Sequence, residues 1–272
     1  MMFRLSLIFA CLALWGSERP FVSAKLCGQL GNQFFQIATA YALAWDHGVD
    51  VCFTDWDYAP GWKTNRHHFF FRCNDQALGR VEHEVSLPGF GYYPIDFRPN
   101  MMLQGFYQNE KYFVHHRARL LELFAPHEKD LKIVRKKFGW ILDHPESVSV
   151  HVRYYRGETQ AACFIQYDRN YFEKAMALFP KSSLFVVTSD CIEFAKKHIP
   201  TEGRNVVFIQ SAPYYQAFLI QRYCKHQIIS NSTFSWWSAW LNENLNKIVV
   251  RPKVWLGGFP DIGGPDEWIK VE

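Results

Sequence analysis

The chain has 272 residues, of which 49% are hydrophobic and 17% aromatic. A chain of this length and composition can build a large packed core, in one large or two modest domains, and is not a disordered protein. The formal net charge of +4 comes from 30 Lys and Arg against 26 Asp and Glu, with no basic run on one element, so a nucleic-acid partner is not expected.

The N-terminus, residues 1–20, forms an apolar extension. Residues 5–15 are apolar and follow Arg4, as in a signal peptide, and residues 22–24 resemble a signal-peptidase site. A membrane-spanning helix needs about 20 apolar residues, so this stretch is too short to span comfortably. Cleavage after residue 24 would also cut the first predicted strand. We therefore expect a non-essential extension or weak membrane association through residues 5–15, in a cytoplasmic or membrane-associated protein.

Short apolar runs alternate with longer helical stretches in the first part of the chain, which predicts an α/β fold with parallel strands. Residues 58–100 are rich in Gly, Pro, aromatic residues and His without a clear period, and they predict loops with minor elements. Strands are expected over 21–28 and 49–55 and within 100–113, and helices over 32–48, stopping at Gly48, and over 115–126.

A second α/β series begins at Ser147 and continues through most of the remaining chain. Strands are expected over 147–153, 182–190, 205–210, 226–230 and 247–252, and helices over 168–180, 191–199, 212–224 and 235–244. Asp168 or Asn170 is expected near the cap of the first of these helices. The pattern predicts two Rossmann-like halves, residues 21–145 and 146–272.

A glycine-bearing turn, residues 28–36 (GQLGNQFFQ), joins the first strand to its helix. Such a turn aims backbone N–H groups and a helix N-terminus at a ligand above it, which suits anions or sugar hydroxyls. It is neither a dinucleotide fingerprint nor a Walker loop. The alternative is a tight structural turn in which Asn32 caps the helix. The ligand-binding candidates are Gly28, Gly31, Asn32 and Gln33.

Residues 151–158 (HVRYYRGE) place two guanidinium groups at and just beyond the end of a predicted strand. Ligands of open α/β sheets bind beyond the carboxyl ends of the strands, and the planar guanidinium matches phosphate. We interpret Arg153 as functional for this reason. His151 taken alone is more simply a buried core histidine, and the alternative for Arg156 is a solvated loop charge.

Two more strand ends carry polar residues. Ser189 and Asp190 end the strand VVTSD, where a carboxylate can accept from ribose hydroxyls or a base, or cap the next helix. The turn NSTFS offers hydroxyls, an amide and helix N–H groups as a neutral phosphate cradle. Trp236 and Trp237, which follow it, are predicted to pack in the core. The candidates in the turn are Asn231, Ser232, Thr233, Phe234 and Ser235.

The sequence gives little support for a bound metal. The seven cysteines are scattered, odd in number and never spaced as CxxC, which argues against a zinc cluster or a disulfide framework and favours free buried thiols. Asp55 and Asp57 resemble the paired aspartates with which some sugar transferases hold a divalent cation. Two loop aspartates are more often simply exposed, so no metal is expected there.

Four stretches in this order resemble the alpha-1,2-fucosyltransferases of glycosyltransferase family 11. They are residues 28–44, 151–158, 186–190 and 226–242 (HQIISNSTFSWWSAWLN), and the last is the most specific. The resemblance covers residues 21 to about 255. It implies a GT-B-like fold of two Rossmann-like halves facing a central cleft, with the acceptor side in the N-terminal half and the sugar-donor side in the C-terminal half.

The implied reaction is the inverting transfer of fucose from GDP-fucose to O-2 of a terminal galactose on a glycan, without a metal or cofactor. By resemblance, Arg153 matches the first arginine of the family motif His-x-Arg-Arg-Gly-Asp and would neutralise charge on the leaving GDP. His151 matches the histidine of that motif. Asp190 matches the first aspartate of the family's Ser-Asp-Asp.

The arginine motif departs from the family pattern. A gapless match puts Tyr154 where the family has its second arginine. If the two tyrosines are an insertion instead, Arg156, Gly157 and Glu158 restore the Arg-Gly-acid sequence, and we prefer this match. The catalytic candidates are then Arg153, Arg156 and Glu158, with Glu158 as a base that assists the acceptor.

Two rival interpretations stay open. One is another nucleotide-sugar glycosyltransferase, including a metal-dependent one that uses the aspartate pair. The other is a non-catalytic protein that binds GDP or carbohydrate. The altered arginine motif makes the second conceivable, as does Cys191 in place of the family's second aspartate.

Overall fold

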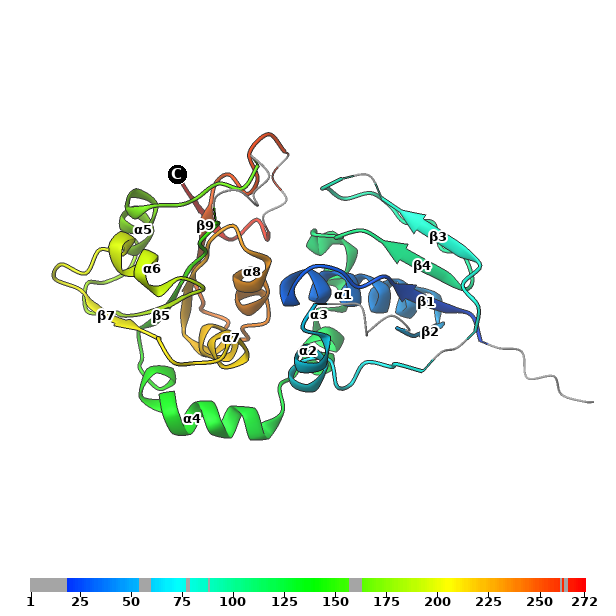
Figure 1. Ribbon diagram of the computed structural model, residues 1–272, viewed down its shortest axis with the longest axis horizontal. Helices are drawn as coiled ribbons and strands as arrows, with labels where there is room; N and C mark the ends of the chain where they lie inside the picture. The colour runs from blue at the N-terminus through cyan, green and yellow to red at the C-terminus, as the bar shows by residue number, and fades with distance from the viewer. Residues whose placement is uncertain are drawn as a thin grey trace, which may run out of the picture.

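The computed structural model describes residues 19–53, 60–76, 79–87, 89–156, 163–259, 261 and 264–272. They form two α/β halves, each built on a parallel sheet, and some helices of the two halves meet between the sheets (Figure 1). This architecture confirms the predicted α/β class with parallel strands.

The N-terminal half is built on a four-stranded parallel sheet with the order β2-β1-β4-β3. Helix α1 ends at Gly48 as predicted, because the left-handed φ of 64° there lets its N–H bond the carbonyls of Ala44 and Trp45. The strands are β1 (Phe21–Ala24), β2 (Asp50–Val51), β3 (His83–Ser86) and β4 (Met101–Gln104). The helices of this half are α1 (Leu30–His47), α2 (Trp62–His68) and α3 (Arg117–Leu123), with short 3-10 helices η2 (Glu110–Tyr112) and η3 (Val114–His116). Helix α4 (Glu128–Leu142) follows them in the chain and packs on the C-terminal half (Figure 1).

The C-terminal half has a six-stranded parallel sheet with the order β10-β9-β8-β5-β6-β7. Its first strand in the chain, β5, lies in the middle, and the strand order reverses between β5 and β8. The strands are β5 (Ser147–Val152), β6 (Leu184–Ser189), β7 (Asn205–Phe208), β8 (His226–Ile228), β9 (Val249–Pro252) and β10 (Ile269–Val271). The helices are α5 (Arg169–Met176), α6 (Ile192–His198), α7 (Tyr214–Tyr223) and α8 (Thr233–Trp240). Asp168 caps α5 as predicted, since its side chain accepts from the N–H of Asn170.

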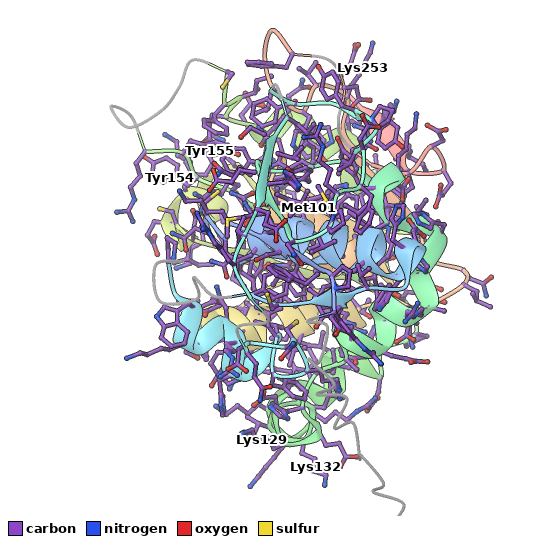
Figure 2. All side chains as sticks on the ribbon, turned by 90° about the vertical axis from the view of Figure 1, so that its right-hand side faces the viewer. Met101, Lys129, Lys132, Tyr154, Tyr155 and Lys253 are labelled. Atoms are coloured by element: carbon purple, nitrogen blue, oxygen red, sulfur yellow. The ribbon has the colours of Figure 1, made fainter. Side chains whose placement is uncertain are left out.

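Two elements lie where no element was predicted. Helix α4 buries only four side chains, and Lys129 and Lys132 project from it away from the rest of the molecule (Figure 2). A helix with so narrow an apolar face gives a weak periodic signal. Strand β10 is an edge strand of three residues, too short for an alternating pattern to be recognised.

An aromatic core joins the two halves. The ring of Phe34 in α1 lies 5.2 Å from that of Trp237 in α8 and 5.4 Å from that of Phe218 in α7. Phe35 packs on Trp236 with ring centres 4.6 Å apart. These rings are buried, which confirms the predicted core role of the two tryptophans. Since one continuous core holds α1 against α7 and α8, the start of α1 is fixed relative to the C-terminal sheet.

The described residues also bear on the predictions for the N-terminal extension and the cysteines. No described helix has the length and apolarity needed to cross a membrane. Residues 5–15 lie outside the described residues, so membrane association stays a prediction, as does the division into domains 21–145 and 146–272. Three of the six cysteines in the described part of the chain are buried.

Candidate functional site

A cleft of about 640 Å³ lies between the two halves, where the strands of the C-terminal sheet end. Its walls include the start of α1, the residues that follow β5 and β6, and the turn from β8 into α8. The strand order reverses between β5 and β8, and such switch points are where open parallel sheets bind ligands. The predicted candidates in its lining are Gly31, Asn32, His151, Arg153, Ser189, Asp190, Asn231, Ser232, Thr233 and Phe234.

Arg153 directly follows β5 and is anchored to the end of β8. Its backbone N–H donates to the hydroxyl of Ser230 at 3.1 Å, and that hydroxyl donates to the carbonyl of His151 at 2.6 Å. Its guanidinium pairs with the carboxylate of Asp190 and lies 5.4 Å from the centre of the Tyr155 ring. The side chain of Arg153 is still 40% exposed, so a fixed positive charge faces the cleft.

Asp190 directly follows β6 and holds the arginine segment. Besides the guanidinium of Arg153, its carboxylate accepts from the backbone N–H of Tyr154 at 2.8 Å. The alternative prediction that Asp190 caps α6 is wrong, because Cys191 occupies the N-cap position and Asp190 precedes it. Asp190 is the one acidic residue among the described residues of the lining, and it is engaged with Arg153.

The starts of α1 and α8 meet at the cleft. The hydroxyl of Thr233 donates to the side-chain oxygen of Asn32 at 3.2 Å, and the amide of Gln108 donates to the same oxygen at 2.9 Å. Neither helix has a hydrogen bond from an N-cap side chain, so their first N–H groups, which lack intrahelical acceptors, can serve an anion. The alternative prediction that Asn32 caps α1 is wrong, because the N-cap is Gln29 and Asn32 lies in the first turn.

His151 lies at the end of β5, and its side chain is buried in the wall of the cleft. Burial and the positive charge of Arg153 lower its pKa from 6.5 to about 3. The imidazole is therefore neutral near pH 7 and does not act as a general acid there. Its Nδ1 is buried without a hydrogen-bond partner in the described part of the chain.

The neutral, buried His151 predicts a pH dependence of stability. In the unfolded chain the imidazole takes up a proton near pH 6.5, whereas in the folded protein it does so only near pH 3. The free energy of unfolding is thus expected to fall as the pH drops below 6.5, with His151 contributing at most about 1.4 kcal/mol per pH unit. Urea denaturation between pH 7 and 4.5 measures this slope. A His151→Asn variant with the wild-type slope would contradict the prediction.

The other candidates among the described residues lie outside the cleft lining. Gln33 is buried, and its amide donates to the carbonyls of Gly28 at 3.0 Å and Pro60 at 2.9 Å, which shapes the turn before α1. Ser235 donates to the carbonyl of Ser232 inside α8. Arg156 is exposed. Glu158, Gly157, Asp55 and Asp57 lie outside the described residues.

Sequence reasoning missed several residues of the cleft. Gln108 lies in the segment that follows β4, next to β1 in its sheet, so the rule that placed Arg153 could also have indicated it. Phe106 also follows β4, so the same rule could have indicated it. No local signal marks Phe90 and Phe164. Phe90 and Phe106 stack with ring centres 6.1 Å apart, and Tyr155 stacks on Phe164 at 5.0 Å. The cleft therefore combines the ion pair of Arg153 and Asp190 with aromatic walls.

Comparisons with known proteins point to one family. A sequence model described as Glycosyl transferase family 11 matches residues 91–256. An alpha-1,2-colitosyltransferase of Escherichia coli is 28% identical over 92% of this chain and 99% of its own length. The O-antigen biosynthesis glycosyltransferase WbnK of Escherichia coli is 28% identical over 86% of this chain and 94% of its own. Galactoside alpha-(1,2)-fucosyltransferase 2 of Oryctolagus cuniculus is 27% identical over 79% and 65%.

Solved structures with the same architecture are fucosyltransferases. The fucosyltransferase NodZ from Bradyrhizobium matches with a TM-score of 0.53 and 13% identity, over 80% of this chain and 91% of that chain. The fucosyltransferase FUT1 of Arabidopsis thaliana, in complex with GDP, matches with a TM-score of 0.52 and 12% identity, over 86% and 71%. At such identities the likeness concerns the fold, and it confirms the predicted GT-B-like arrangement.

Proposed function

Because this chain belongs to glycosyltransferase family 11, we propose that it transfers fucose from GDP-fucose to O-2 of a terminal galactose on a glycan, inverting the anomeric carbon without a metal. The observation that carries the proposal is the place of Arg153. Its guanidinium lies at the point where the strand order of the C-terminal sheet reverses, in a cleft that the starts of α1 and α8 also line.

These features match the diphosphate of a nucleotide sugar. A guanidinium binds phosphate oxygens through paired hydrogen bonds, and two helix N-termini add the positive ends of their dipoles. Ser189 and Asp190, at the end of the neighbouring strand β6, are within the same cleft and can accept from ribose or base. In this proposal the C-terminal half holds the sugar donor.

The chemistry we propose is a displacement in which the acceptor hydroxyl attacks the anomeric carbon from the face opposite GDP. The bond from that carbon to the phosphate oxygen breaks, and the negative charge that develops on the diphosphate is stabilised by Arg153 and by the N–H groups at the start of α8. Neutral His151 can donate one hydrogen bond to the same charge. The hydroxyl proton passes to a base, for which Glu158 remains our candidate.

The aromatic walls support a sugar acceptor. Phe106 and Phe164 line the cleft and are 37% and 39% exposed, so a ligand in the cleft can reach their rings. The apolar C–H face of a hexose packs well on an aromatic ring, while its hydroxyls remain free to bond polar groups such as Gln108. Phe90 and Phe106 belong to the N-terminal half, where we place the acceptor.

A second candidate sugar donor has support of its own. The colitosyltransferase matches this chain over 99% of its own length, whereas the rabbit fucosyltransferase matches over 65% of its own. Colitose is fucose without the 3-hydroxyl group. A site that hydrogen-bonds this hydroxyl rejects the analogue lacking it by orders of magnitude, so the two sugars can be distinguished by rate.

The test is a transfer assay in EDTA with GDP-fucose and GDP-colitose, a galactose-terminated acceptor, and assignment of the product linkage by NMR. We expect fucose to be transferred to O-2, with a higher kcat/KM for GDP-fucose than for GDP-colitose. Faster transfer of colitose would establish the second candidate. Binding of GDP without transfer of either sugar would contradict both, and loss of activity in EDTA would contradict the metal-independent mechanism.

A further inference from the structure

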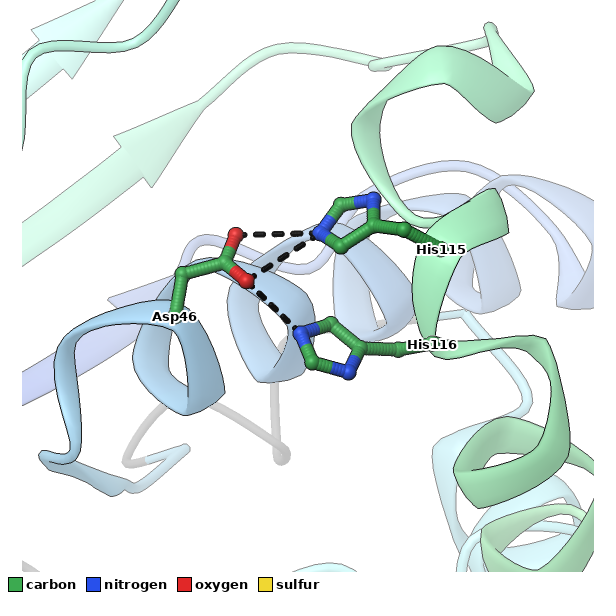
Figure 3. A group of neighbouring side chains, drawn as sticks. All are labelled: Asp46, His115 and His116. Atoms are coloured by element: carbon green, nitrogen blue, oxygen red, sulfur yellow. Dashed lines mark hydrogen bonds and ion pairs between the residues drawn. The ribbon is translucent and has the colours of Figure 1, made fainter.

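Away from the cleft, three side chains bring nitrogen and oxygen atoms together at the far end of α1 (Figure 3). Asp46 lies in the last turn of α1, and His115 and His116 form the end of η3. The Nε2 of His116 lies 2.7 Å from Oδ1 of Asp46, and the Nε2 of His115 lies 3.0 Å from Oδ2. The two nitrogens and the carboxylate oxygen all lie within 4.8 Å of one another.

We propose that Asp46, His115 and His116 form a zinc site that ties the end of α1 to η3. Imidazole nitrogen and carboxylate oxygen are the ligands that zinc takes in proteins besides cysteine, at about 2.0–2.2 Å, which puts neighbouring ligands of a tetrahedral ion about 3.3 Å apart. The two separations between histidine and aspartate, 2.7 and 3.0 Å, are close to this spacing. Water would fill the fourth position.

Zinc would replace the protons that now lie between these groups. In the metal-free form each histidine can donate its Nε2–H to the carboxylate. In the bound form each ring presents the Nε2 lone pair to the ion and keeps its proton on Nδ1. The same three side chains therefore suit both forms, and only the binding of zinc distinguishes a metal site from a set of hydrogen bonds.

The site is pre-oriented and accessible. The ring of His116 packs edge-on against Trp45, with centres 5.2 Å apart, and its side chain is 18% exposed. Asp46 and His115 are 40% and 46% exposed, so an ion can reach them from solvent. One ligand is thus held by packing, while the other two are free to adjust around the metal.

The position in the helix favours a cation. Asp46 places a negative charge at the C-terminal end of α1, where the helix dipole is also negative. A carboxylate alone is unfavourable there, and a divalent cation bound to it would remove the conflict. This electrostatic argument is independent of the spacing of the three ligands.

The proposed zinc would not take part in transfer. Asp46 comes 15 residues after Gly31 on the same helix, which puts it about 22 Å from the cleft end of α1. We therefore assign the ion a structural role, in which it holds η3 and the following α3 against α1. The proposal stands whether or not the chain transfers fucose.

Calorimetric titration with zinc chloride tests the site, on full-length protein purified without a histidine tag and freed of metal with a chelator. We expect the wild type to bind one zinc ion and to melt at a higher temperature as zinc is added. Asp46→Asn, His115→Ala and His116→Ala should each weaken binding by about 100-fold or more, since even groups that only orient a ligand cost 10–100-fold.

His47→Gln is the matched control, because His47 is the next residue of α1 and its ring stacks on Phe97 at 4.1 Å. It should bind zinc as the wild type does. The proposal is overturned if the wild type takes up no zinc, or if the three ligand variants bind it unchanged. Loss of binding in His67→Ala instead would place the ion in the separate group of His67, His68 and His127. Melting curves without zinc show whether each variant is folded.

Discussion

Replacing Arg153 by alanine is expected to lower kcat/KM for sugar transfer by about a thousandfold, the size of effect seen when a preorganised charge-stabilising group is removed. The reason is the fixed position of the guanidinium. The backbone N–H of Arg153 is anchored on Ser230 and its guanidinium is oriented by Asp190 before any ligand arrives, so the guanidinium needs little reorganisation as charge develops on GDP. Arg153→Lys keeps the charge but loses the planar fork, and should recover only part of the rate.

The same substitution separates this role from a structural one. The side chain of Arg153 is 40% exposed, and its one ion pair among the described residues is with a residue of the cleft, so the melting temperature of Arg153→Ala should stay close to that of the wild type. Calorimetry with GDP should show weaker binding. Unchanged turnover, or a loss of activity explained entirely by unfolding, would contradict the assignment.

Asp190 is coupled to this prediction. If its carboxylate acts only by orienting Arg153, then Asp190→Asn should cost activity in the wild type and nothing more in the Arg153→Ala background. If it also binds ribose or base, the double variant should bind GDP more weakly than Arg153→Ala alone. The double-mutant cycle therefore says which of the two roles the carboxylate has.

The sequence predicted the part of the cleft that the C-terminal half supplies because that part follows one rule. Arg153 directly follows β5, Ser189 is the last residue of β6, and the turn over residues 231–235 begins shortly after β8. The carboxyl ends of parallel strands share one edge of a sheet. A local pattern is enough to find them. The predicted cap at Asn32 failed for a local reason too, since Gly28, with a φ of 68°, turns the chain early and α1 starts at Leu30.

The rest of the cleft depends on contacts between distant segments. Gln108 meets Asn32 across 76 positions of sequence, and Thr233 meets it across 201. The cluster of Asp46 with His115 and His116 likewise joins residues about seventy positions apart. Single-sequence patterns describe one element at a time, and they carry no information on which helix end faces which loop.

Gly31 is the position where fold and site depend on the same contact, and Gly31→Ala is expected to lower the free energy of unfolding by about 3 kcal/mol. A Cβ there would lie 2.4 Å from the carbonyl carbon of Thr233 and 2.6 Å from the backbone nitrogen of Phe234. A side chain could rotate away, but the backbone of α8 cannot move without displacing the aromatic core behind it. The start of α1 would then separate from the start of α8 and widen the cleft.

The expected loss of stability in Gly31→Ala is opposite in sign to the usual effect of this substitution in a helix. Alanine inside a helix normally stabilises by about 0.5–1 kcal/mol relative to glycine, so the contact with α8 has to reverse the usual gain. Gly139→Ala in α4 is the matched control, because its Cβ would meet only the carboxylate of Asp143, at 3.7 Å. Urea denaturation should show the control to be at least as stable as the wild type and Gly31→Ala to be less stable. If both variants gained stability, α1 and α8 would not meet as closely as the structure shows, and the two helix N-termini could not serve one diphosphate.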